Sequence, residues 1–182
     1  LHEAGVVHRN LSPHTVCIRT HDNGDVDVGL TGFEFARIQA EQTMAGDLTG
    51  LYEATTAYEA PEVLADLSLA SEATDFYSAA IIALELLTEK SAAQLLSECE
   101  SASDCIILEA VAAQERNLEG LLEALVLLIL SEPAGRMELV DEIFRMLHEV
   151  AAASEHPSDG QAEEGPEELT VYAKGDIIDK QY

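Results

Sequence analysis

The chain has 182 residues, of which 47% are hydrophobic and 24% charged, a composition typical of a globular domain with one sizeable core. It carries 35 Asp and Glu residues against 9 Lys and Arg residues, and the net charge of -26 argues against nucleic acid and anionic membranes as partners, because both would repel the chain. The longest apolar stretch, Leu121–Leu130, is too short to span a bilayer and the three cysteines suit reduced thiols, so we expect a cytoplasmic protein.

The β-strand signals lie in the first 38 residues. Val16–Arg19 and Val26–Leu30 are rich in residues that favour strands, and His21–Gly24 between them has the chemistry of a tight turn. These segments predict a short β-hairpin. Residues 39–56 show no sustained hydrophobic period and predict a long loop.

The chain from there to about residue 152 has the patterns of α-helices. In Thr74–Thr88 apolar residues recur at helical spacing and also fill other faces, which predicts a central helix that is buried nearly all round. Residues 131–135, which include Pro and Gly, should separate the last two helices. The other expected helices are Ala92–Ser97, Cys105–Gln114, Leu118–Leu130 and Met137–Ala152. The predicted fold class is mainly α, within the α+β class because of the hairpin.

Two segments follow the helical part. Residues 153–170 are acidic and lack apolar periodicity, which predicts a disordered linker. Residues 171–182 regain β-type apolar residues such as Val171 and Ile177, so order should resume there. Residues 1–152 are thus the predicted domain.

Five motifs stand in a fixed order along the predicted domain. They are His8–Pro13, Gly32–Glu34, Ala60–Glu62, Asp75–Ala80 and Glu132–Arg136. Together they resemble the C-terminal lobe of eukaryotic-like, bacterial serine/threonine protein kinases, in which a catalytic loop precedes Asp-Phe-Gly, an activation segment and Ala-Pro-Glu. The resemblance implies a helical lobe with a hairpin at the catalytic loop and without the small N-terminal lobe.

Four positions within this resemblance, which spans residues 1–152, depart from the family pattern. Asn10 stands where the family has its catalytic base, and a carboxamide has no basic site near neutral pH. Ser12 replaces a lysine that would stabilise the transferring phosphoryl group, and Thr15 replaces a metal-binding asparagine. Gly32 replaces the metal-binding aspartate and offers no side chain. No catalytic residue of the family is therefore intact, and we expect no metal site.

A substitute for the lost metal ligands is conceivable in the hairpin. Asp22, Asp25 and Asp27 carry carboxylates near the predicted turn. The turn itself favours such residues, so their presence does not require a metal.

Five other positions match the family and imply structural roles. By resemblance, His8 and Phe33 stack in a hydrophobic spine. Asp75 caps the backbone of the catalytic loop from the central helix. Glu62 pairs with Arg136 beneath the activation segment, and a buried pair of this kind would be kept for folding alone.

Arg9 has two interpretations. By resemblance it would meet a phosphate on the activation segment. It could equally be held by backbone carbonyls. The candidate phosphate acceptors are Thr43, Thr49, Thr55 and Thr56.

The resemblance implies a pseudokinase that regulates or binds a kinase domain, in the same polypeptide or in another protein. ATP and magnesium are cofactors of the family, and none is expected for this fragment, which lacks the Gly-rich loop and strand lysine of the small lobe. Residues 171–182 resemble the approach to a second kinase domain. The alternatives are an active serine/threonine kinase with unorthodox residues and a decayed gene fragment. The negative charge indicates solubility rather than a surface for basic partners.

Overall fold

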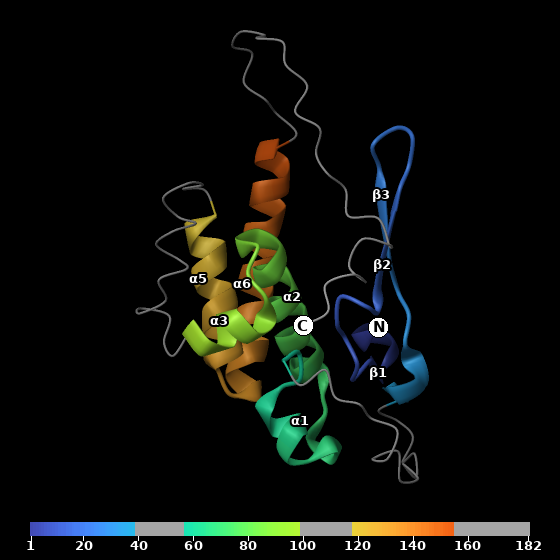
Figure 1. The fold of residues 1–182 in the computed structure, drawn as a ribbon, viewed down its shortest axis with the longest axis vertical. Coiled ribbons are helices and arrows are strands. Elements are labelled where there is room, and N and C mark those ends of the chain that lie inside the picture. The colour runs from blue at the N-terminus through green and yellow to red at the C-terminus, as the bar shows by residue number, and fades with distance from the viewer. Residues whose placement is uncertain (39–56, 99–117, 155–182) are drawn as a thin grey trace, which may run out of the picture.

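A computed structural model of the chain describes residues 1–38, 57–98 and 118–154. The described part is mostly helical, with short strands confined to the N-terminal segment (Figure 1). The strands are β1 (Val6–Val7), β2 (Val16–Thr20), β3 (Val26–Leu30) and β4 (Arg37–Ile38). The 3-10 helices are η1 (His2–Ala4), η2 (Phe33–Phe35) and η4 (Leu67–Leu69). The α-helices are α1 (Pro61–Ala65), α2 (Glu72–Thr88), α3 (Ala92–Glu98), α5 (Glu119–Leu130) and α6 (Pro133–Ser154).

The hydrophobic core lies among α2, α3, α5 and α6, which pack side by side in Figure 1. Ile81 and Leu84 of α2, Leu95 of α3 and Leu122 of α5 are all 0% exposed. Fully burying one such side chain stabilises a fold by roughly 1.5–3 kcal/mol. The helices therefore supply most of the apolar burial in the described part of the chain.

The central helix α2 begins two residues before its predicted start, at Glu72. The Thr74 hydroxyl explains the difference, because Oγ1 of Thr74 accepts a hydrogen bond from the amide of Ser71 at 3.3 Å and so closes the first turn. The helix is buried along its first half, as predicted. Leu86 near its end is 73% exposed, which corrects the expectation of burial nearly all round.

The predicted helices α3 and α5 are confirmed to within one residue at each end. Helix α6 begins at Pro133, earlier than the predicted Met137. Proline suits the first position of a helix, where its missing N–H would have no partner, so it starts this helix instead of breaking the chain before it. The end of α6 at Ser154 also lies past the predicted start of the linker at residue 153.

The predicted hairpin is confirmed, with β2 one residue longer than expected. Strands β2 and β3 are antiparallel, and Ile18 lies opposite Val28. Both side chains are largely exposed, at 64% and 67%. The hairpin stands beside the helical body in Figure 1 and does not share its core.

Helix α1 and the strand pair β1 and β4 were not predicted. Helix α1 has five residues, too few for a hydrophobic period to be visible. Strands β1 and β4 pair antiparallel over two residues each, with Val7 opposite Arg37. The predicted helix Cys105–Gln114, the loop 39–56 and residues 155–182 lie outside the described residues. Within the described part, no helix is long and apolar enough to cross a membrane.

Candidate functional site

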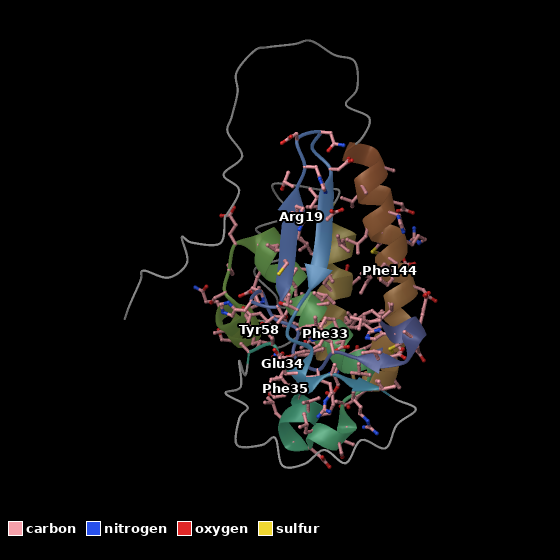
Figure 2. All side chains as sticks on the ribbon, turned by 90° about the vertical axis from the view of Figure 1, so that its right-hand side faces the viewer. Arg19, Phe33, Glu34, Phe35, Tyr58 and Phe144 are labelled. Carbon is pink, nitrogen blue, oxygen red and sulfur yellow. The ribbon has the colours of Figure 1, made fainter. Side chains whose placement is uncertain are left out.

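The candidate site is the loop between β1 and β2, together with the end of β3. The loop begins at His8 and ends at Thr15, and Gly32 follows β3 after one residue, Thr31. Figure 2 shows the next residues, Phe33 to Phe35, at the base of the hairpin. The structure thus brings Asn10, Thr15 and Gly32 together from two segments of the chain.

Asp75 of α2 fixes the start of this loop. Its Oδ2 accepts from the amide of His8 at 2.7 Å, and its Oδ1 accepts from the amide of Arg9 at 2.8 Å. Oδ2 also contacts Nε2 of His2 at 2.9 Å. Asp75 is 3% exposed. The hairpin adds no side chain to the helical core. The Asp75 carboxylate instead links the N-terminal segment to α2 through these hydrogen bonds.

His8 is 0% exposed and links the loop to the segment after β3. Its Nε2 lies 2.9 Å from the carbonyl oxygen of Thr31, and its Nδ1 lies 3.3 Å from the amide of Asn10. A carbonyl only accepts and an amide N–H only donates, so these two partners match the tautomer that carries its hydrogen on Nε2. The ring also meets that of Phe33 edge to face, with 4.8 Å between centroids.

Thr15 closes the loop with its hydroxyl. Oγ1 accepts from the amide of Ser12 at 3.0 Å and lies 3.0 Å and 3.1 Å from the carbonyl oxygens of Asn10 and Ser12. Ser12 is 3% exposed and Thr15 is 8% exposed. The hydrogen and one lone pair of the Thr15 hydroxyl are therefore bonded to the loop backbone, and one lone pair remains.

Gly32 lies in the left-handed region of backbone conformation, with φ of 80°. A Cβ atom built there would lie 2.7 Å from the Thr15 methyl carbon Cγ2 and 3.5 Å from Nδ2 of Asn10. Real Cβ atoms essentially never approach a heavy atom so closely as the first of these distances. The space that a side chain at position 32 would need is therefore taken by Thr15.

Glu62 and Arg136 form a buried ion pair away from this loop. Nη1 of Arg136 lies 2.5 Å from Oε1 of Glu62, and Nη2 donates to Oε2 at 3.2 Å. The Arg136 side chain is 2% exposed and that of Glu62 14%. The guanidinium also lies over the ring of Tyr77, 4.9 Å from its centroid. The pair joins α1 to α6.

Arg9 is a non-glycine residue with φ of 68°, and its own amide donates to Oδ1 of Asp75. The four threonines considered as its phosphate-bearing partners lie outside the described residues.

A second polar contact, between Tyr58 and α2, was not anticipated from the sequence. The Tyr58 hydroxyl donates to Oε2 of Glu85 at 2.7 Å, and Oγ of Ser78 donates to the Tyr58 carbonyl oxygen at 2.7 Å. Burial, and next the bond to the Glu85 carboxylate, raise the pKa of Tyr58 above its ordinary value. The residues are 27 positions apart, so no local spacing could have signalled the contact.

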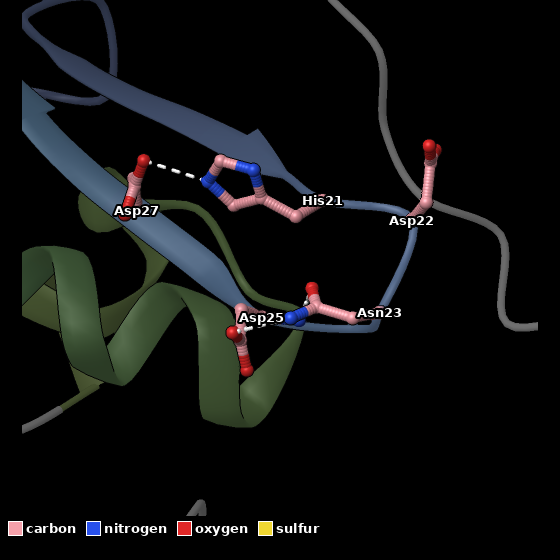
Figure 3. Close-up of a pocket in the computed structure, with 5 residues that line it drawn as sticks. All are labelled: His21, Asp22, Asn23, Asp25 and Asp27. Atoms are coloured by element: carbon pink, nitrogen blue, oxygen red, sulfur yellow. Dashed lines mark hydrogen bonds and ion pairs between the residues drawn. The ribbon is translucent and has the colours of Figure 1, made fainter.

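The acidic residues of the hairpin lie at its far tip. Figure 3 shows a shallow hollow there, in which His21 contacts Asp27 at 2.7 Å and Asn23 donates to Asp25 at 2.6 Å. Strand β3 separates Asp25 from Gly32 by a path of roughly 20 Å, at about 3.3 Å per residue. These carboxylates therefore cannot reach a metal beside Gly32. The described ranges contain no group of three or more His, Cys, Asp or Glu side chains that would hold a metal ion.

Comparisons with known proteins agree on one family. Residues 1–125 match the model of the protein kinase domain. A probable serine/threonine-protein kinase, pknA2, of Bifidobacterium longum is 38% identical over 89 residues, which cover 49% of this chain and 11% of that protein. The mitogen-activated protein kinase p38b of Drosophila melanogaster is 34% identical over 91 residues, 50% of this chain and 22% of that protein. The serine/threonine-protein kinase AtPK1/AtPK6 of Arabidopsis thaliana is 36% identical over 90 residues, 50% of this chain and 17% of that protein.

Proposed function

Since this chain belongs to the protein kinase family, we propose that it is the C-terminal lobe of a pseudokinase, which has kept the scaffold of the family and lost its phosphoryl-transfer chemistry. The chain spans only 11% to 22% of the length of the relatives compared above. The activity of the whole protein is therefore part of the proposal. The observation that supports the pseudokinase proposal is that the Thr15 methyl occupies the space beside Gly32, at the two positions where the family binds metal.

The retained scaffold supports the assignment to this lobe. Asp75 holds the backbone of the loop at His8 and Arg9, and Glu62 pairs with Arg136. These contacts join segments that are 66 to 74 residues apart in the chain. They stabilise the fold and need no catalytic group nearby.

The proton-transfer chemistry of the family does not fit the residues present. Asn10 takes the position of the catalytic base, and its carboxamide cannot accept a proton from a substrate hydroxyl near neutral pH. Loss of a general base lowers a rate by about 10²- to 10⁴-fold. Ser12, at the position of the family's lysine, is buried and supplies no cation.

The residues also do not fit a magnesium ion. Magnesium prefers oxygen ligands in octahedral geometry, usually with one or two carboxylates. Gly32 has no side chain, and Thr15 offers only one lone pair of a neutral hydroxyl that is otherwise bonded to the loop backbone, so neither position supplies a carboxylate. No phosphoryl-transfer step can therefore be derived through a metal bound at these positions.

As a biological role we propose an interaction module that binds or biases a kinase domain, in the same polypeptide or in a partner. Loss of catalysis with retention of the scaffold motivates this role. Residues 171–182, which resemble the approach to a second kinase domain, lie outside the described residues. A cytoplasmic location remains part of the same proposal.

The test measures nucleotide binding and phosphoryl transfer by the full-length protein, with the strand lysine of any second kinase domain replaced. Thermal shift is recorded with ATP, with and without magnesium, and transfer is followed with γ-labelled ATP. We expect no magnesium-dependent shift and no transfer from this domain. The protein with its second kinase domain intact serves as the positive control.

The competing function is an active serine/threonine kinase with unorthodox residues. A magnesium-dependent thermal shift together with labelled product from the protein with the disabled second domain would establish that function and overturn the pseudokinase. Asn10→Asp is the matched variant, because it restores a carboxylate at the base position without a change of size. We expect no transfer from this variant either, since the metal ligands are still missing.

A further inference from the structure

Residues 15 and 32 act as one steric unit. We infer that Thr15 is a positioning residue with two separate functions: its hydroxyl locks the loop from Asn10 to Thr15, and its methyl group reserves the space beside Gly32. A side chain can then return to position 32 only after Thr15 has changed. The consequence for metal binding rests on the proposed function, whereas the steric coupling itself does not.

The hydroxyl carries the first function. It accepts from the amide of Ser12 and faces the carbonyl oxygens of Asn10 and Ser12, all within 3.1 Å. Ser12 is almost fully buried, so its amide would lose a partner that water could not easily replace. The hydroxyl thus does for this loop what a capping side chain does for a helix end.

The methyl group carries the second function. Cγ2 of Thr15 lies 2.7 Å from the position of a Cβ on residue 32. Thr15 is β-branched and stiff about χ1, and rotation about that bond would move the methyl and the hydroxyl together. The methyl therefore cannot retreat unless the hydroxyl gives up its contacts with the loop.

This coupling makes the change at the site difficult to reverse. Gly32→Asp alone would return the carboxylate that the family uses for metal binding, but its Cβ would meet the Thr15 methyl. The chain would first need a smaller or differently shaped residue at position 15. Position 32 thus lacks a metal-binding side chain, and the Thr15 methyl also occupies the space in which one would stand.

The experiment is a double-mutant cycle in the full-length protein, read by urea unfolding. Its corners are the wild type, Gly32→Ala, Thr15→Ser and the double variant. Thr15→Ser keeps the hydroxyl and removes the methyl. We expect Gly32→Ala to lower the folding equilibrium constant about tenfold less in the Thr15→Ser background than in the wild type. Equal effects in both backgrounds would overturn the steric coupling.

Two controls separate the methyl contact from other causes. Alanine in the left-handed region lowers the folding constant by about 5- to 30-fold whatever its neighbours are, and this factor cancels in the cycle. The Gly24→Ala variant reports the backbone penalty alone, because the φ of Gly24 is 87° and a Cβ there would meet nothing within 4 Å. Gly24→Ala should therefore perturb the protein less than Gly32→Ala. Thr15→Val keeps a methyl and should not rescue Gly32→Ala.

The hydroxyl function has its own readout, which does not require any variant at position 32 to fold. Hydrogen exchange of the Ser12 amide should accelerate at least tenfold in Thr15→Val, in line with loss of about 1.4 kcal/mol, and stay near the wild-type rate in Thr15→Ser. Equal rates in the two variants would refute the lock. None of these measurements uses ATP or magnesium, so magnesium-dependent nucleotide binding with phosphoryl transfer by this domain would overturn the proposed function and leave the steric coupling standing.

Discussion

The helical body and the N-terminal hairpin of this chain are stabilised in different ways. The helices bury large apolar side chains such as Leu84 and Leu122 completely. The hairpin exposes its apolar pair, Ile18 and Val28, and is connected to the body through the Asp75 contacts of the loop before it. The comparison teaches that packing sets the stability of the body, whereas a few directed hydrogen bonds set the position of the candidate site.

The largest effect should come from the buried ion pair inside the body. Arg136→Met leaves the Glu62 carboxylate without its partner, and breaking a buried pair from one side costs about 3–5 kcal/mol. Urea unfolding measures this loss. Arg145 of α6 is the matched control, because its pairs with Glu142 and Glu149 are exposed, and Arg145→Met should change stability little. Similar losses in the two variants would contradict the claim that burial inside the helical body sets its stability.

A smaller and more local effect is expected at the link between the two regions. Asp75→Asn replaces one accepting oxygen by an amide nitrogen, which cannot accept from the N–H groups that now point at the carboxylate. A buried donor left without a partner costs about 1–3 kcal/mol. Hydrogen exchange should show the amides of His8 and Arg9 opening before the core of α2 does.

The control for the link is Glu123→Gln, the same chemical change on the exposed face of α5. It should leave exchange at His8 and Arg9 unchanged. Uniform destabilisation of loop and core in Asp75→Asn would show that the two regions unfold together, against the comparison made above.

The smallest effect is expected on the hairpin. Val28→Thr keeps the size and shape of the side chain at a position that is 67% exposed, and should change the free energy of unfolding by less than about 0.5 kcal/mol. Val126→Thr in α5, where valine is 1% exposed, places a hydroxyl in the core and should cost about 1–3 kcal/mol. Chemical denaturation compares the two. A large loss from Val28→Thr would mean that the hairpin face is packed in solution.

The longer elements were predictable from the sequence because their patterns are local. The hairpin and helices α2, α3 and α5 were predicted within two residues at each end. The start of α6 was missed because Pro133 and Gly135 were interpreted as helix breakers, although proline is tolerated in the first turn. Helix α1 was too short to show a period.

For the candidate site, the sequence predicts which residues depart from the kinase pattern, and that stays a prediction; it does not predict how these residues fit together. Asn10, Thr15 and Gly32 were recognised by their order along the chain. The 2.7 Å approach between the Thr15 methyl and position 32 depends on a rotamer and on the positive φ of Gly32. Neither is encoded in spacing, and the same holds for the long-range bond from Tyr58 to Glu85.

A two-stranded sheet leaves both of its outer edges with free backbone groups, and such edges are templates on which a strand from another molecule can add. In the described part of the chain, β2 pairs only with β3. We expect the carboxylates at the tip and the net charge of -26 to repel other copies of the chain. Salt at 1 M shortens the range of that repulsion to about 3 Å. High-salt buffers, often chosen to keep proteins in solution, would therefore favour self-association of this one.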